Sequence, residues 1–276
     1  MRVLSSSANG IQQHFGLNLM QAKTHSKDAS LWRVELMRLT AFLSAVDVSD
    51  ADKWWGTVIG EPPDSKTVKL KGATQTLEGH LGTGKVLLNV DVNRVDWLTA
   101  PDLSVEQEIK EIPNIGAYAE VASLFNSKMV QWLKCNPSIT RLAWGATLTQ
   151  PVEDRESGYK RLSNYLPALK IDPVGSSELF YQINRPRQSK VIPGLVINRF
   201  QKWSVMKVQR INVQVIPSQA QAMVGNVAPG FDGCRVEVDI NSSGDRSELL
   251  PSDRLESLYM ELVSIGTEIA AQGDIA

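Results

Sequence analysis

The sequence predicts an α+β protein with mainly antiparallel sheets and packed helices, and two observations carry this prediction. Segments with strand character follow one another without the regular strand–helix alternation of a parallel sheet. The segments 88–96 and 236–245 also share a V-D-[VI]-N core, and an amphipathic helical pattern follows each of them. Duplication would produce this match, and so would chance, because short matches arise easily in alternating strands. Two related halves therefore remain an open alternative.

The 276 residues suffice for one large domain or for two domains of ordinary size. The chain is 42% hydrophobic and 21% charged, which is typical of a globular protein and excludes a disordered one. We expect a poorly patterned segment over 1–30, a first α+β half over 31–175 and a second α+β half over 176–276.

The first elements follow from apolar spacing and capping signals. The apolar run 31–43 predicts a strand. Ser49 is followed three residues later by Asp52, which resembles a capping box. The short helix that this pair predicts would bury Trp54 and Trp55 as core anchors.

Residues 66–97 predict one β-hairpin with its turn at the G-T-G-K stretch. In its second arm, 86–93, apolar and polar residues alternate, so one face is buried and the other is wet. A helix should open at Asn114, because apolar residues then recur at 3.6-residue spacing. Asn136 and Pro137 should end it.

The rest of the chain predicts five more strands and two more helices. A strand should be followed by a short helix from Ser157, and the chain should close with a helix from Ser252 or Asp253 to Gly273. The expected strands are 139–148, 179–184, 195–200, 203–215 and 234–241.

Charge and cysteine usage predict a cytoplasmic protein with no cofactor and no membrane partner. The net charge is −1 and the pI about 6.3, so no global field attracts the chain to nucleic acid or an acidic membrane. No stretch is long and apolar enough for a signal peptide or a membrane span. Cys135 and Cys234 lie far apart without a CxxC spacing, which argues against structural zinc and favours reduced, buried thiols.

The stretch Gly79–Lys85 matches the first seven positions of the phosphate-binding loop G-x-x-x-x-G-K-[ST]. Val86 cannot supply the hydroxyl that holds magnesium. The mechanism also needs a helix N-terminus after the loop, whereas an alternating strand follows here. We therefore interpret this stretch as a hairpin turn and predict that it binds no nucleoside triphosphate.

Acidic residues near the hairpin offer a second hypothesis, a metal-dependent phosphodiesterase or nuclease. The triplet that begins with Glu108 and ends with Lys110 resembles the tail of a PD-(D/E)xK nuclease motif. Its chemistry needs two or three carboxylates that converge on a hard cation. Asp102 stands too close to Glu108 for the two separate strands of that motif. The metal ligands of this alternative would be Asp91, Asp96 and Glu108.

The segment Leu179–Arg185 resembles the L-x-Y-I-N-R-like strand of a sporadically distributed family of uncharacterised bacterial proteins of similar length. Gln182 is an extra residue within the motif. The V-D-I-N strand at 238–241 and the closing amphipathic helix extend the resemblance. Genes of this family occur patchily, so the resemblance implies a bacterial defence or toxin–antitoxin-like context. It implies no catalytic residue.

Our first hypothesis is a non-enzymatic protein-binding or regulatory module. The sequence offers no set of titratable groups in an evident catalytic arrangement, and a general base at His80 would need Asp91 beside it. Tryptophan and arginine dominate interface hot spots, and both occur around the loops between 185 and 203. We predict as partner-binding residues Arg185, Arg187, Arg199 and Trp203.

Two alternatives to this surface remain open. Together with Lys190 and Lys202, the same arginines form the nearest candidate for a nucleic-acid patch, and they also fit a solvated face beside a buried Trp203. A third functional hypothesis is a small-molecule pocket between two sheets, lined by tryptophans.

Overall fold

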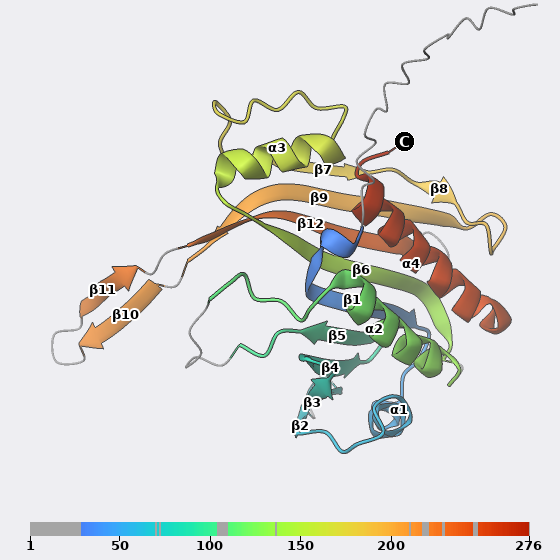
Figure 1. The fold of residues 1–276 in the computed structure, drawn as a ribbon. Coiled ribbons are helices and arrows are strands. Elements are labelled where there is room, and N and C mark those ends of the chain that lie inside the picture. The colour runs from blue at the N-terminus through green and yellow to red at the C-terminus, as the bar shows by residue number, and fades with distance from the viewer. Residues whose placement is uncertain are drawn as a thin grey trace, which may run out of the picture.

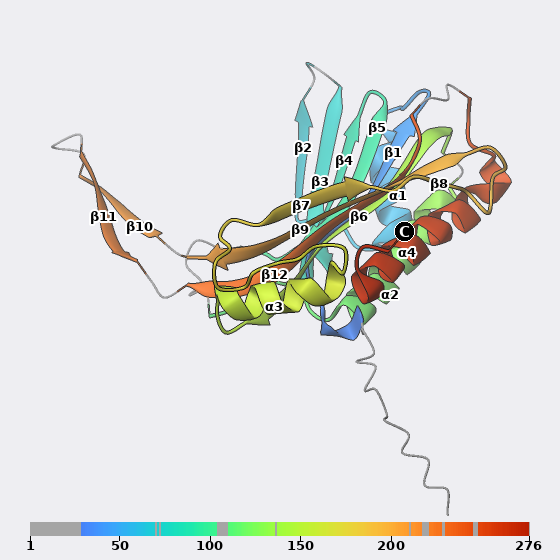
Figure 2. The same cartoon turned by 90° about the horizontal axis from the view of Figure 1, so that it is seen from above.

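The chain folds into one large antiparallel sheet with helices on one side. In the computed structural model the described residues form a ten-stranded sheet, four α-helices and a separate two-stranded hairpin (Figures 1 and 2). All strand pairings are antiparallel, which confirms the predicted α+β class. The structure describes residues 29–69, 71, 73–103, 110–135, 137–209, 211–216, 221–227, 230–244 and 248–275.

The strands cross the sheet in an order that differs from their order in the chain. From one edge to the other they are β2 (Ser65–Lys69), β3 (Thr74–Leu81), β4 (Gly84–Asp91), β5 (Arg94–Ala100), β1 (Arg33–Leu43), β6 (Ile139–Val152), β12 (Phe231–Ser242), β9 (Val196–Val208) and β7 (Phe180–Asn184). The short β8 (Arg187–Gln188) also pairs with β9. The hairpin of β10 (Ile211–Ile216) and β11 (Gln221–Val227) projects from the ends of β9 and β12.

The four helices pack on the same face of the sheet (Figure 2). They are α1 (Asp50–Val58), α2 (Tyr118–Leu133), α3 (Arg155–Tyr165) and α4 (Leu255–Gln272). Asp154 caps α3 through its side chain, three residues before the predicted start. None of the helices in the described part of the chain is long and apolar enough to cross a bilayer.

The order of elements repeats around the centre of the sheet. β1 and β6 pair in the middle, with Met37 opposite Ala146. On one side of this pair lie β5 and then β4, and on the other side lie β12 and then β9. In the chain, β5 and β12 are each the last strand of their half, and a long helix, α2 or α4, closes each half. The junction of this repeat lies between α2 and β6. The predicted division into 31–175 and 176–276 falls after α3, and the single sheet spans both points.

The prediction that the two V-D-[VI]-N strands are equivalent is wrong. Counted from the junction, β4 is the third strand of its half, whereas β12 is the second. Their similar sequences reflect the alternation of apolar and polar residues that any half-buried strand requires. This alternation recurs in strands that occupy unrelated places in a sheet.

Residues 66–97 form four strands rather than one hairpin. The predicted turn is confirmed at Gly82–Thr83, where Gly82 has a φ of 60°. A further turn at Val92–Asn93 divides the second arm into β4 and β5. The side chain of Val92 is 58% exposed, so the apolar alternation ends one residue before it.

The core lies between the sheet and the helices and contains all seven tryptophans. Trp54 and Trp55 are buried as predicted. Trp144 of β6 packs against Gly266 of α4, and Trp32 donates from Nε1 to the carbonyl oxygen of Ala270 at 2.7 Å. These side chains fill the space between the sheet and the helices.

Candidate functional site

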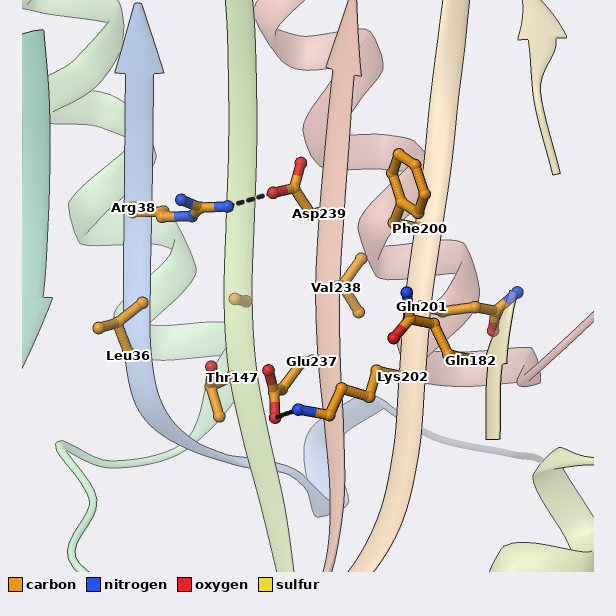
Figure 3. A pocket seen from close by; sticks show the side chains of 11 residues that line it. Leu36, Arg38, Thr147, Gln182, Phe200, Gln201, Lys202, Glu237, Val238 and Asp239 are labelled. Atoms are coloured by element: carbon orange, nitrogen blue, oxygen red, sulfur yellow. Dashed lines mark hydrogen bonds and ion pairs between the residues drawn. The ribbon is translucent and has the colours of Figure 1, made fainter. Parts of the chain in front are cut away.

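The sheet face opposite the helices, called here the open face, carries a hollow of about 360 Å³ (Figure 3). Strand register places two neighbouring rows of residues along it. One row contains Arg38, Gly145, Asp239 and Phe200, and the other contains Leu36, Thr147, Glu237, Lys202 and Gln182. The hollow thus combines apolar side chains with charged side chains at both ends.

A β-bulge in β1 brings two residues to this face. The pairing of β1 with β6 shifts between Val34 and Leu36, so Glu35 is the extra residue. Val34 lies in the core, whereas Leu36 lines the hollow and Glu35 reaches Arg235. Such bulges re-aim side chains next to functional sites.

Arg38 extends across the neighbouring strand to reach Asp239. The two residues belong to β1 and β12, and β6 lies between them. A Cβ atom at Gly145 of β6 would stand 2.7 Å from Nε of Arg38, so only glycine leaves room for the guanidinium group to lie flat. This ion pair forms one end of the hollow (Figure 3).

A chain of charges forms the other end. Lys202 lies 2.9 Å from Glu237, and Arg235 lies 3.2 Å from both Glu237 and Glu35. Burial raises the pKa of Glu35, and the nearby charge of Glu237 raises it further, while Arg235 lowers it. The hollow is therefore bounded by charges that neutralise one another.

A row of amides continues the polar surface beside the hollow. Asn184 donates to Asn198, and Asn198 donates to Asn241. Arg141 donates to the same Asn241 oxygen at 2.8 Å, and its guanidinium group lies 5.4 Å from the ring centroid of Phe42. These contacts join five strands and hold the open face as one polar surface.

The four predicted partner-binding residues lie near one another, but two of them are buried. Trp203 is fully buried and Arg199 is 4% exposed, so neither can be reached by a partner. Both face the helices, because they alternate along β9 with the open-face residues. Arg185 and Arg187 retain exposed atoms, and their contact with a partner stays a prediction.

Asp274, which follows α4, binds Arg185 directly and is linked to Trp203 through Gln201. Asp274 accepts from Nε and Nη2 of Arg185 at 2.7 and 2.8 Å, from Tyr181 at 2.6 Å and from Gln201 at 2.8 Å. Trp203 in turn donates to Gln201. The Arg185 guanidinium holds the pKa of Asp274 below its usual value.

The alternative metal ligands are not brought together by the residues that the structure describes. Asp96 is 7% exposed and accepts hydrogen bonds from Thr40 and Arg94 at 2.5 and 2.9 Å. Asp91 accepts from the amide of Val92 beside it, and Glu108 lies outside the described residues. Within the described ranges, His, Cys, Asp and Glu form no group of three able to hold a metal ion.

The remaining motif residues have ordinary environments. His80 contacts Asp64 at 2.9 Å, and register places it opposite Lys85, so the pairing with Asp91 is wrong. Lys85 itself forms an ion pair with Glu78 at 2.6 Å. Both cysteines are free thiols, and Cys234 is buried.

Sequence reasoning missed the open face because its key contacts join distant positions. Arg38 and Asp239 are 201 residues apart, and nothing local to either one indicates the other. The glycine within the predicted strand 139–148 was the available signal, because glycine inside a strand often marks the close approach of another group. No protein-family model, curated protein or solved structure matched this chain in our comparisons.

Proposed function

We propose that this chain is a non-enzymatic protein-binding module that holds its partner on the open face, with the hollow at the centre of the contact. The observation that carries the proposal is an amphiphilic hollow on the sheet face that the described helices leave uncovered (Figure 3). Interfaces of this kind combine an apolar centre with a polar rim. Here Leu36 and Phe200 supply the apolar part, and the two ion-paired groups supply the rim.

Aromatic side chains extend the apolar part beyond the hollow. Phe180 is 57% exposed and Phe200 is 37% exposed. The ammonium group of Lys202 lies 4.9 Å from the ring centroid of Phe180, which holds that ring in place. A partner that inserts one large apolar side chain into the hollow would cover both rings without leaving a charge unpaired.

The charge pattern of the open face argues against a polyanionic partner. Lys85, Arg94, Arg38, Lys202 and Arg235 each contact a carboxylate of the same face. Nucleic-acid binding draws its affinity from cations that neutralise phosphates. Binding a phosphate chain here would require these ion pairs to break first.

The metal-dependent phosphodiesterase or nuclease remains the second hypothesis, without a supporting observation. Asp96 is engaged by Thr40 and Arg94, so it would need to exchange both partners for a cation. Cleavage of nucleic acid by the purified protein with magnesium or manganese, abolished by Asp91→Ala, would establish the enzyme instead.

The family resemblance supplies the cellular context of the proposal. We place the module in the cytoplasm of a bacterium, as part of a defence or toxin–antitoxin-like system. The identity of neighbouring genes tests this context, since a partner gene of such a system should be encoded beside this one.

Photo-crosslinking from inside the cell tests the proposed face. A benzophenone amino acid is placed at Phe200 and, as a matched control, at Met260 of α4, which is apolar and 45% exposed on the helix side. We expect one protein adduct from Phe200 and none from Met260. The Phe200 adduct should disappear when Leu36→Glu puts a charge into the hollow.

Two outcomes would contradict the proposal. Adducts of equal yield from both positions would mean that the open face has no preference for the partner. An adduct that persists in the Leu36→Glu background would mean that the hollow is not part of the contact. Circular dichroism of each variant confirms that the fold is retained.

A further inference from the structure

A buried arginine, two of whose nitrogen atoms have no hydrogen-bond partner among the described residues, lies on the other side of the sheet. Arg199 of β9 is 4% exposed and faces the helices. Its Nε and Nη2 atoms have no hydrogen-bond partner among the described residues. A buried guanidinium group without a partner is costly, because it has lost water and gained nothing in exchange.

The two unpartnered atoms form one side of the guanidinium fork. Arg185, its neighbour, uses the same pair of atoms to hold the two carboxylate oxygens of Asp274 at 2.7 and 2.8 Å. Arginine and an oxyanion prefer this two-pronged arrangement. Arg199 therefore presents an empty fork beside a filled one.

The local charge is unbalanced in the same direction. The charges of Arg185, Arg187, Glu268 and Asp274 all act on Arg199, so three guanidinium groups share two carboxylates. Arg187 contacts Glu268 at 3.3 Å and leaves its own buried Nε without a partner among the described residues. One further negative charge would complete the group.

We propose that this arginine cluster, made of Arg185, Arg187 and Arg199, binds one oxyanion whose two oxygen atoms occupy the empty fork of Arg199. The ligand class is a small free anion with a carboxylate or a phosphate group, because Arg199 is too deeply buried for a larger partner to reach it. The site lies under α4 and beside β8 (Figure 1), on the opposite face from the proposed protein contact, and it does not depend on that contact.

Burial also lowers the pKa of Arg199, and the charge of Arg187 lowers it further. An oxyanion would act in the opposite direction and would remove the penalty of the buried charge. The protein should therefore be more stable against thermal unfolding when the arginine cluster holds an oxyanion.

The experiment is a thermal melt of the full chain at pH 7 in sodium chloride, sodium phosphate or sodium acetate at equal ionic strength. Wild type is compared with Arg199→Met, which keeps the apolar stem and removes the fork. At ten times the dissociation constant, the anion should raise the wild-type midpoint by about 3–6 °C more than that of the variant. Lys160→Met on α3 is the control, because this side chain is exposed and lies in neither proposed site, and it should keep the full response to the anion.

The outcomes separate the possible ligands. A response to both anions identifies a carboxylate-sized site, and a response to phosphate alone identifies a phosphate group. In chloride, Arg199→Met should melt at or above the wild-type temperature, because it removes a buried guanidinium group whose Nε and Nη2 atoms have no partner among the described residues. Equal anion responses in wild type and Arg199→Met would overturn the proposal, and so would a marked loss of stability of Arg199→Met in chloride.

Discussion

Gly266 of α4 lies directly against the six-membered ring of Trp144 in β6, so the ring occupies the space that a side chain at this position would need. Gly266→Ala would push a methyl group into that ring, and we expect the free energy of unfolding to fall by about 3 kcal/mol. Urea denaturation followed by tryptophan fluorescence measures the change. Gly56→Ala is the control, because a Cβ atom there meets nothing within 4 Å and should add about 0.5–1 kcal/mol of helix stability. Equal effects of the two substitutions would contradict the close approach.

Asp274→Asn should destabilise the protein by about 3 kcal/mol at pH 7, because Arg185 loses the charge that it holds in a forked pair. The folded-state pKa of Asp274 is lowered, chiefly by Arg185. Its contribution is therefore complete above the unfolded-state pKa of about 3.9 and is lost as the pH falls through the lower folded-state pKa. Unfolding curves of both proteins between pH 7 and pH 2 should converge at the acid end. A constant difference across this range would assign the effect to packing instead of charge.

Glu35→Gln should change the free energy of unfolding in the opposite direction from Asp274→Asn. Burial raises the folded-state pKa of Glu35, so the charged carboxylate is disfavoured in the fold at neutral pH. We expect Glu35→Gln to be as stable as wild type or more stable at pH 7. As the pH falls through the raised folded-state pKa, the free energy of unfolding of the wild type should rise relative to that of Glu35→Gln. This rise should be complete below the unfolded-state value of about 4.3. Glu237→Gln is the comparison, and it should lose up to about 1 kcal/mol with the ion pairs of Lys202 and Arg235.

The two thiols should react at very different rates. Burial raises the pKa of Cys234 to about 12, and its Sγ atom donates to the carbonyl oxygen of Gly158 at 3.1 Å. Only the thiolate is a nucleophile, so Cys234 should react with Ellman's reagent only after unfolding. Cys135 is half-buried, and its pKa is also raised by burial, so it should react slowly in the native protein. Cys135→Ser should abolish native-state labelling, and any fast reaction that remains would contradict the assignment.

Elements with a regular apolar period could be predicted from the sequence. In β6, Leu142, Trp144 and Leu148 fall on the helix-covered face as their alternation indicates. The stripe of α2 is buried in the same way, although the helix begins at Tyr118 instead of Asn114. In both elements most of the residues that face the core are apolar, with Asn126 and Gln150 as exceptions, so the sequence reveals the period.

The pattern failed where polar residues face the core. Along β9 the helix-facing positions include Arg199 and Gln201, so the sequence suggested two strands with a break near residue 201. The side chain of Gln201 can be buried because it donates to Asp274, which follows α4 in the chain. The candidate sites could not be predicted for the same reason, since Asp274 and Glu35 gain their roles from contacts that only the folded sheet creates.

The hydrogen bond from Trp32 to Ala270 joins positions 238 residues apart, and it has a consequence for how the protein is made. Trp32 immediately precedes β1, and the second neighbour of β1 in the sheet, β6, is synthesised only after β5 and α2. α4, which packs on β6, β9 and β12 near the centre of the sheet, leaves the ribosome after all the strands of the sheet. Long-range pairing of this kind slows folding and exposes unpaired strand edges in the meantime. The nascent chain should therefore depend on chaperones during translation until α4 has docked.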